Sequence, residues 1–376
     1  MTPSQARLLL SDGGRAAVAF AERLDLDPIP AAEQMRGYGD LGPLALSQAV
    51  LRRKALAKHP DGDRLWWTAD ALEQSTPRPV AVHRAARFAG AERVLDLGCS
   101  VGGDLLPLAA VAPVVGVDLD EARLLLARAN AAELGLEVSL VCADITSMEP
   151  TGAVFADPAR RAGGRRGFDP AGWSPPLDRV LSWDVRSLGV KVAPGIDYDR
   201  LPPDVDVEVV SLGGDVKEAV LWRGAVRTGF RRTATLLPSG ERVVDAGAPV
   251  PRVAPPGRYL LEPDGAVIRA HLVEEVVRQV DGWLLDASIA YVSADLAVPT
   301  AFGRWYEVAE VMPFSLKRLK ERLRALDAGT LVVKKRGTAV EPEALRRQLR
   351  LTGSRDVTVV LTRSAGAQIA IIARPL

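Results

Sequence analysis

The chain of 376 residues contains little of three residue types on which many functional sites depend: two Cys, three His and only 5% aromatic residues. Cys99 and Cys142 exclude a disulfide framework and any CxxC zinc or redox motif. His59, His83 and His271 are too few and too far apart for most histidine-based metal centres. We therefore expect no metal site.

The sequence also lacks a run of about 18 consecutive apolar residues, which excludes a membrane-spanning helix. Its first residues, MTPSQARLLLSDGG, do not place a basic segment before an apolar one, as a secretory signal does. We therefore expect a cytoplasmic protein without a membrane partner. With 48% hydrophobic and 25% charged residues, the composition is typical of globular proteins, and at roughly 150 residues per domain the length predicts two or three domains.

A net charge of one sign is nearly absent as well, because 48 Lys and Arg face 47 Asp and Glu, a formal net charge of +1. Taken alone, such a total argues against a nucleic-acid partner. It hides an asymmetry: residues 299–376 hold 15 Lys and Arg against 7 Asp and Glu, a net charge of +8, which leaves −7 for residues 1–298. The last segment therefore has the charge that a polyanion would attract.

The order of apolar patterns predicts the domain organisation. Residues 1–78 place apolar residues three and four apart between Gly and Pro, which predicts a cap of short helices. From Val80, buried strand runs alternate with helices, which is typical of a parallel α/β sheet. The expected strands are 93–100, 114–120, 138–144, 153–160, 180–185, 205–212 and 231–238, with helices at 103–111 and 121–135.

A Pro- and Gly-rich linker at 245–258 separates this sheet from the rest of the chain. Residues 256–298 then predict a small strand, helix and strand unit. Residues 299–376 predict a further basic domain, with helices at 315–326 and 342–350 and strands at 331–337, 357–363 and 367–376. The predicted domains are thus 1–78, 79–244, 256–298 and 299–376.

The strongest local signal is the run from Val94 to Gly103, VLDLGCSVGG, where a buried strand enters a glycine-rich turn and then a helix. Such a turn lets the backbone approach a ligand closely. The next strand ends at Asp118, whose carboxylate can accept hydrogen bonds from both hydroxyls of a ribose. The third ends at Asp144 and Ile145, which suit an adenine amino group and its ring. No GxGxxG dinucleotide fingerprint is present.

This pattern resembles the class I S-adenosylmethionine-dependent methyltransferases over roughly residues 79–240. The resemblance implies a Rossmann-like, seven-stranded α/β sheet with S-adenosylmethionine lying across the C-terminal ends of its first strands. Gly98, Gly102, Asp118 and Asp144 match the family's cofactor positions, and Asp96 matches the acidic residue that holds the glycine turn and the methionine end of the cofactor. Packing glycines in an ordinary α/β sheet are the alternative.

The fourth strand ends in Asp157 and Pro158. In methyltransferases that act on exocyclic amino groups this position reads Asp/Asn-Pro-Pro-aromatic, where the first residue accepts a hydrogen bond from the target amino group and the ring stacks on the base. The match implies that Asp157 and Pro158 are catalytic. Ala159 and Arg160 replace the second proline and the aromatic residue. Three residues further along either supply the missing ring or pack in the core: Phe168, Trp173 and Trp183.

Four arginines follow in the loop RRAGGRRG: Arg160, Arg161, Arg165 and Arg166. They either bind phosphates of a polynucleotide or form a solvated loop paired with acidic residues of the N-terminal part. Neither cysteine is placed as a nucleophile, since Cys99 lies inside the glycine turn and Cys142 within a strand that we expect to be buried. This favours direct methyl transfer without a covalent intermediate.

Two further resemblances cover more of the chain. The segments DLGCSVGGDLLPLAA and VVGVDLDEARLLLARANAAELGL resemble the core of the trimethylguanosine synthase group. The motifs DPARR, KVAPGID, YLLEPDGAVIRA and VVKKRG resemble bacterial methyltransferases that end in a ferredoxin-like unit and a THUMP-like domain, here 256–298 and 299–376. THUMP domains are associated with RNA binding, which implies that Lys334, Lys335 and Arg336 face RNA. A solvated basic turn is the alternative.

We therefore predict a cytoplasmic S-adenosylmethionine-dependent methyltransferase that acts on RNA, either rRNA or tRNA, by direct transfer. Three alternatives remain open from the sequence: a methyltransferase of proteins or small molecules, a catalytically silent RNA-binding relative, and an NAD-linked oxidoreductase.

Overall fold

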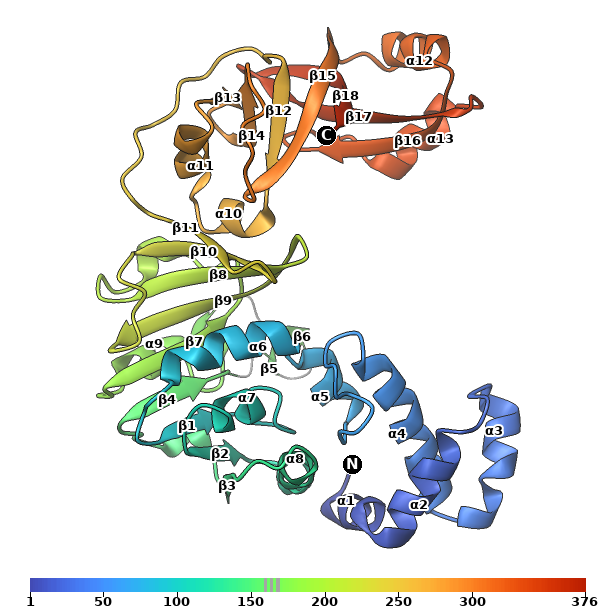
Figure 1. The fold of residues 1–376 in the computed structure, drawn as a ribbon, viewed down its shortest axis with the longest axis vertical. Coiled ribbons are helices and arrows are strands. Elements are labelled where there is room, and N and C mark those ends of the chain that lie inside the picture. Colours follow the sequence, from blue (N-terminus) through green and yellow to red (C-terminus); the bar gives the residue numbers. More distant parts are fainter. Residues whose placement is uncertain (159–160, 163–164, 167–169) are drawn as a thin grey trace. The chain divides into compact units, whose positions relative to one another are not determined.

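The computed structural model describes residues 1–158, 161–162, 165–166 and 170–376 (Figure 1). The chain divides into two compact units: residues 1–206 with 217–228, and residues 207–216 with 229–376. In the described part of the chain, no helix is long and apolar enough to cross a membrane.

The N-terminal segment is helical, as its periodicity predicts. Polar side chains cap several of these helices: Thr2, Ser11 and Thr68 each accept a hydrogen bond from a backbone N–H in the first turn that follows. The helices are α1 (Pro3–Leu10), α2 (Asp12–Ala21), α3 (Pro28–Gln34), α4 (Leu41–Ala55), α5 (Ala69–Gln74) and α6 (Arg78–Ala85), with short 3₁₀ turns η1 (Arg36–Tyr38) and η2 (Ala86–Phe88).

Helices α1, α2, α4 and α5 share an apolar core with α8 (Glu121–Glu133), the helix that follows β2 (Val114–Asp118), and α1 contacts α8 directly (Figure 1). Buried Trp66 and Trp67 share a core with Leu126 of α8. Isolated helices of this length are marginal in water even when they are capped. Each short helix therefore depends on packing its apolar side against a partner.

One side chain links the helical cap to the sheet. Asn130 of α8 is fully buried, and its Oδ1 accepts a hydrogen bond from the N–H of Trp66 at 2.7 Å. Its Nδ2 donates to the carbonyls of Trp66 at 3.0 Å and Val101 at 2.8 Å. Because Val101 belongs to the glycine turn, Asn130 fixes the cap and that turn to the same helix.

The glycine turn lies in a nine-stranded sheet of order β11-β10-β8-β9-β7-β4-β1-β2-β3. β1 pairs in parallel with β2 and β4, β2 with β3, and β4 with β7, whereas β7 and β9 are antiparallel. The remaining strands are β1 (Val94–Leu97), β3 (Ser139–Cys142), β4 (Ala153–Ala156), β7 (Ser187–Val192), β8 (Asp206–Leu212), β9 (Asp215–Gly224), β10 (Arg232–Leu237) and β11 (Glu241–Val244). Two shorter helices belong to this region, α7 (Leu105–Ala109) and α9 (Leu177–Ser182).

The Rossmann-like α/β fold is confirmed, with three differences from the sequence prediction. The sheet has nine strands where the resemblance implies seven, since β10 and β11 extend it. The segment 180–185 is not a strand: Leu177, Val180 and Leu181 lie three and four apart and are buried on one side of α9, and the strand is β7. β9 and β11 were not predicted, whereas β10 coincides with the predicted strand 231–238.

Cys142 corrects a further prediction, because it is exposed and not buried. It belongs to β3, which lies at the edge of the sheet, so that three of the strand's four residues face solvent. An apolar run at a sheet edge has a neighbour on one side only, which the run itself does not reveal.

The second unit contains a seven-stranded sheet of order β13-β14-β12-β15-β18-β17-β16. β12 and β15 pair antiparallel, so strands from 256–298 and from 299–376 join in one sheet; the domain limits stay predictions. Its elements are β12 (Tyr259–Pro263), α10 (Gly265–Arg269), α11 (Val273–Gln279), β13 (Trp283–Asp286), β14 (Ile289–Ala294), β15 (Gly303–Pro313), α12 (Leu316–Ala325), β16 (Ala328–Lys335), α13 (Pro342–Leu349), β17 (Arg355–Ser364) and β18 (Ala367–Pro375).

Asn130→Ala tests the link between cap and sheet. The change leaves the N–H of Trp66 and two carbonyls buried without partners, so we expect the free energy of unfolding to fall by about 2–4 kcal/mol. Urea unfolding followed by tryptophan fluorescence measures it. Arg128→Ala, an exposed site on the same helix, is the control and should change little. Equal midpoints for the two variants would mean that the Asn130 hydrogen bonds do not hold the cap in place.

Candidate active site

The C-terminal ends of three strands meet beside the glycine turn. The Gly98 N–H donates to the carbonyl of Val117 in β2 at 2.8 Å, and the Asp157 N–H donates to the carbonyl of Leu97 in β1 at 3.2 Å. The backbone therefore brings the predicted residues at the ends of β1, β2 and β4 to one edge of the sheet. Ligands of open α/β sheets bind at this edge.

The turn has little room for a side chain at two of its positions, Gly98 and Gly102. Gly98 and Gly102 have φ values of +93° and +102°, a region that L side chains rarely adopt. A Cβ atom on Gly98 would lie 3.1 Å from the carbonyl oxygen of Asp157, and one on Gly102 would lie 3.1 Å from Cγ of Leu106. Both glycines are required by the backbone, as the motif predicts.

Asp118 and Asp144 present carboxylate oxygens at the ends of β2 and β3. Oδ2 of Asp118 accepts from the N–H of Ser100 and Oδ1 from that of Asp120, both at 2.9 Å, which fixes the carboxylate beside the turn. Oδ1 of Asp144 accepts from the N–H and the hydroxyl of Thr146, and these bonds lower the pKa of Asp144. Oδ2 of the exposed Asp144 is left to accept from a ligand, next to the half-buried Ile145.

Asp96 is a buried carboxyl group whose oxygens lack hydrogen-bond donors within the described part of the chain. It is 1% exposed in β1, and neither of its oxygens has a hydrogen-bond partner among the residues that the structure describes. Burial raises the pKa of Asp96 well above its ordinary value. A buried polar group without a partner is costly, and a donor such as the amino group of a cofactor would satisfy it. This observation, together with the two glycines, fits S-adenosylmethionine.

A cluster of buried charges lies around the strand ends. The Arg84 guanidinium of α6 donates to both carboxylate oxygens of Glu218 in β9, each at 2.6 Å, and also to Asp104. Its Cζ lies 4.3 Å from the centroid of the Phe155 ring. Burial alone would lower the pKa of Arg84, but the two carboxylates raise it.

The second cation of the cluster, Lys191 of β7, pairs with the predicted catalytic residue. Its ammonium donates to Oδ2 of Asp157 at 2.8 Å. Burial alone would lower the pKa of Lys191, but the nearby carboxylates, Asp157 first among them, raise it. The side chain of Lys191 is 9% exposed and that of Asp157 is 28% exposed. Asp157 therefore faces the open side, next to the buried Pro158, while the ammonium lies beneath it.

Sequence reasoning did not single out Lys191 or Arg84. A signal for Lys191 was present, because it is the only charged residue in a strand whose six residues are all buried. Lysine is almost never fully buried unless it is paired. The carboxylates themselves lie in distant segments of the chain, and nothing local in the sequence assigns them to these cations.

The predicted arginine loop is described in part. Arg161 and Ala162 form β5, Arg165 and Arg166 form β6, and Arg161 lies opposite Arg166 in an antiparallel pair. Arg160 and Phe168 lie outside the described residues. Trp173 and Trp183 are buried, as expected if they pack in the core and do not supply the missing aromatic ring.

The predicted RNA-binding triplet of the second unit already has intramolecular partners. Lys334 pairs with Glu262 at 2.9 Å and Lys335 with Glu341. The guanidinium of Arg336 lies 5.5 Å from the centroid of the Tyr291 ring. Across the described ranges, no group of three or more His, Cys, Asp or Glu side chains is placed to hold a metal ion.

Comparisons with known proteins agree with this geometry. The family described as "methyltransferase domain" matches residues 94–156, and that described as "THUMP domain-like" matches residues 303–375. A crystal structure from Porphyromonas gingivalis W83, described as that of a methyltransferase, is 21% identical and superposes with a TM-score of 0.77 over 96% of this chain and 97% of that one, which shows the same fold.

Relatives from two strains of Mycobacterium tuberculosis, CDC 1551 / Oshkosh and H37Rv, are each 41% identical over 355 residues, which span 90% of this chain and 98% of theirs. Both are described as S-adenosylmethionine-dependent methyltransferases. The NAD-linked alternative is therefore excluded. The chain belongs to the S-adenosylmethionine-dependent methyltransferases, and S-adenosylmethionine is its cofactor.

Proposed function

We propose that this methyltransferase acts on RNA by direct methyl transfer and that Asp157 orients the acceptor. The observation that carries the assignment of Asp157 is its position: the residue follows β4 with its backbone carbonyl beside Gly98, and its partly exposed carboxylate is held by Lys191. S-adenosylmethionine supplies an electrophilic methyl group on a sulfonium. The protein must therefore bind the cofactor and align the acceptor nucleophile with that methyl group.

In this proposal, each strand end binds a different part of the cofactor. Asp118 accepts hydrogen bonds from the ribose hydroxyls, and Asp144 with Ile145 receives the adenine. Gly98 and Gly102 let the backbone approach, and Asp96 takes the amino group of the methionine end. Support for these roles comes from the unpartnered oxygens of Asp96 and the left-handed glycines described above.

Lys191 and Asp157 act as a unit in this proposal. The ammonium occupies Oδ2 of Asp157, which fixes the carboxylate and leaves Oδ1 to accept an N–H from the acceptor. Alignment of a nitrogen lone pair with the methyl group is the main requirement of such a transfer. Pro158 restricts the backbone directly after Asp157. Lys191 is thus a positioning residue, since it acts through Asp157.

RNA is the acceptor that charge and family membership favour. The THUMP domain-like match at 303–375 coincides with the segment that carries +8. We propose that Arg160, Arg161, Arg165 and Arg166 contact phosphates near the acceptor. Lys334, Lys335 and Arg336 stay candidates for RNA contact, although Lys334 and Lys335 each pair with a carboxylate. A cytoplasmic rRNA or tRNA would be the substrate.

Asp118→Ala tests the cofactor site. Because a hydrogen bond to a charged group contributes about 1.5–3 kcal/mol, we expect the affinity for S-adenosylhomocysteine, measured by calorimetry, to fall at least about 10-fold. Glu137→Ala, which removes an exposed carboxylate just before β3, is the matched control and should bind as the wild type does. Unchanged affinity in Asp118→Ala would remove this residue from the cofactor site.

A double-mutant cycle tests the acceptor site. RNA from cells that lack the gene is incubated with the enzyme and radiolabelled S-adenosylmethionine. We expect Asp157→Ala to lower kcat at least about 1000-fold, to a residual rate that the radiolabel still detects, and Lys191→Met to lower kcat about 10- to 100-fold, both without a change in S-adenosylhomocysteine affinity. In the Asp157→Ala background, Lys191→Met should have no further effect, because coupled residues are not additive.

Two outcomes contradict this assignment. Full activity in Asp157→Ala would refute the role of the carboxylate. If residual transfer is measurable and the two losses multiply, Lys191 acts independently of Asp157. Transfer to protein or small molecules in place of RNA would favour the alternative acceptors instead.

A further inference from the structure

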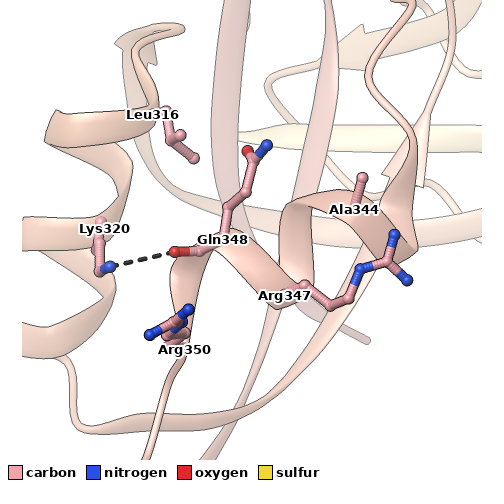
Figure 2. Close-up of a pocket in the computed structure, with 6 residues that line it drawn as sticks. All are labelled: Leu316, Lys320, Ala344, Arg347, Gln348 and Arg350. Carbon is pink, nitrogen blue, oxygen red and sulfur yellow. Dashed lines mark hydrogen bonds between the residues drawn. The ribbon is translucent and has the colours of Figure 1, made fainter.

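We propose that RNA backbone phosphates bind in a hollow between α12 and α13 of the second unit, a site that deepens the proposed RNA function and rests on it. The hollow is lined by side chains of both helices (Figure 2). Leu316 and Lys320 come from α12, Ala344, Arg347 and Gln348 from α13, and Arg350 follows α13 directly.

The packing of the two helices leaves cations on their outer faces, where the hollow lies. Leu319 and Leu323 of α12, and Leu345 and Leu349 of α13, lie four apart and are buried in the core of the sheet. Each helix therefore has one narrow apolar stripe, and the residues beside the stripe face outward. In α12 these positions are mostly Lys and Arg, and in α13 they include Arg346 and Arg347.

These cations are not neutralised by the protein itself. The Lys320 ammonium donates to the backbone carbonyl of Gln348 at 3.1 Å, as Figure 2 shows. Among the described residues, no carboxylate oxygen lies within 4 Å of a side-chain nitrogen of Lys320, Arg347 or Arg350, so none of the three forms an ion pair. Neighbouring cations differ, since Arg322 pairs with Glu310 and Arg346 with Glu343.

Arg350 provides a second, independent observation. It has φ +45° and ψ +59°, the left-handed conformation at the end of α13 in which glycine is usual. An arginine there carries a strain of roughly 1–2 kcal/mol that glycine would avoid. Its side chain lies in the hollow (Figure 2). A cation at a helix C-terminus also stabilises the helix through the negative end of its dipole. The experiment below separates this stabilising role of Arg350 from ligand binding.

The lining favours the backbone of a polynucleotide over its bases. It contains three cations and an amide but no aromatic side chain on which a base would stack. Phosphate contacts from Lys and Arg supply affinity without reading sequence. Contacts of this kind would hold the RNA while the first unit selects the acceptor.

The experiment compares two variants of the full-length protein that lose the same charge. The hollow variant carries Lys320→Gln, Arg347→Gln and Arg350→Gly. The matched variant carries Arg93→Gln, Arg128→Gln and Arg242→Gln, three exposed arginines of the sheet region to which no RNA contact is assigned. Affinity for bulk tRNA and for a mixed-sequence single-stranded RNA is measured against salt concentration. S-adenosylhomocysteine affinity and melting temperature confirm that each variant is folded.

We expect the hollow variant to bind RNA about 10- to 100-fold more weakly than wild type. Its slope of log K against log salt should be flatter by about 2, because each phosphate that the protein no longer neutralises removes about 0.7–0.9 from the slope. The matched variant should stay near the wild-type slope. An unchanged slope in the hollow variant, or flattening only in the matched variant, would overturn the proposal. If inorganic phosphate displaces RNA from the hollow more strongly than chloride does at the same ionic strength, the hollow is a site for small anions, and the proposal is also overturned.

The single change Arg350→Gly tests the strained arginine. We expect it to weaken RNA binding while the melting temperature holds or rises. A lower melting temperature with full RNA affinity would mean that Arg350 only stabilises the helix end. If the wild-type protein binds neither RNA, the proposed RNA function itself fails, which is distinguishable from a failure of the hollow alone.

Discussion

The ion pair between Lys191 and Asp157 allows a charged group to stand at the end of β4, in the middle of the sheet. The strand positions beneath it are apolar, and a buried charge without a partner would shift to its neutral form or disrupt the packing. Lys191 supplies the opposite charge, and Arg84 does the same for Glu218 and Asp104. The cluster thereby presents one carboxylate on the open side, directly beside the glycine turn.

Local motifs made much of this site predictable. The glycine turn, Asp118 and Asp144 follow strands that the sequence marks clearly, and parallel pairing brings the ends of those strands together. Asp157 was found in the same way, from its position after the fourth strand. These residues need only the order of neighbouring elements, which short-range pattern supplies.

The partners of these residues were not predictable, because the chain brings them from far away. Arg84 and Glu218 are 134 residues apart, and Lys191 lies 34 residues after Asp157. The helix α9 was mistaken for a strand, since a short apolar run has no unique period. In the second unit, the basic run ending at Arg336 looks free in sequence, yet Glu262 and Glu341 pair with its lysines. Lys320 and Arg347, which have no carboxylate partner among the described residues, instead lie on α12 and α13, and only the packing of Leu319 and Leu345 shows that they share one surface.

The near-neutral total charge therefore conceals two separate regions: a buried and balanced cluster, which we propose aligns the acceptor, and an unbalanced basic surface, which we propose holds a polyanion. The central claim is that the acceptor is RNA. Mass-spectrometric analysis of nucleosides from total RNA tests it most directly, in cells with the gene, without it, and with Asp157→Ala in its place. The account predicts that one methylated nucleoside disappears without the gene and returns with the wild type but not with the variant. An unchanged set of methylated nucleosides in all three would contradict it.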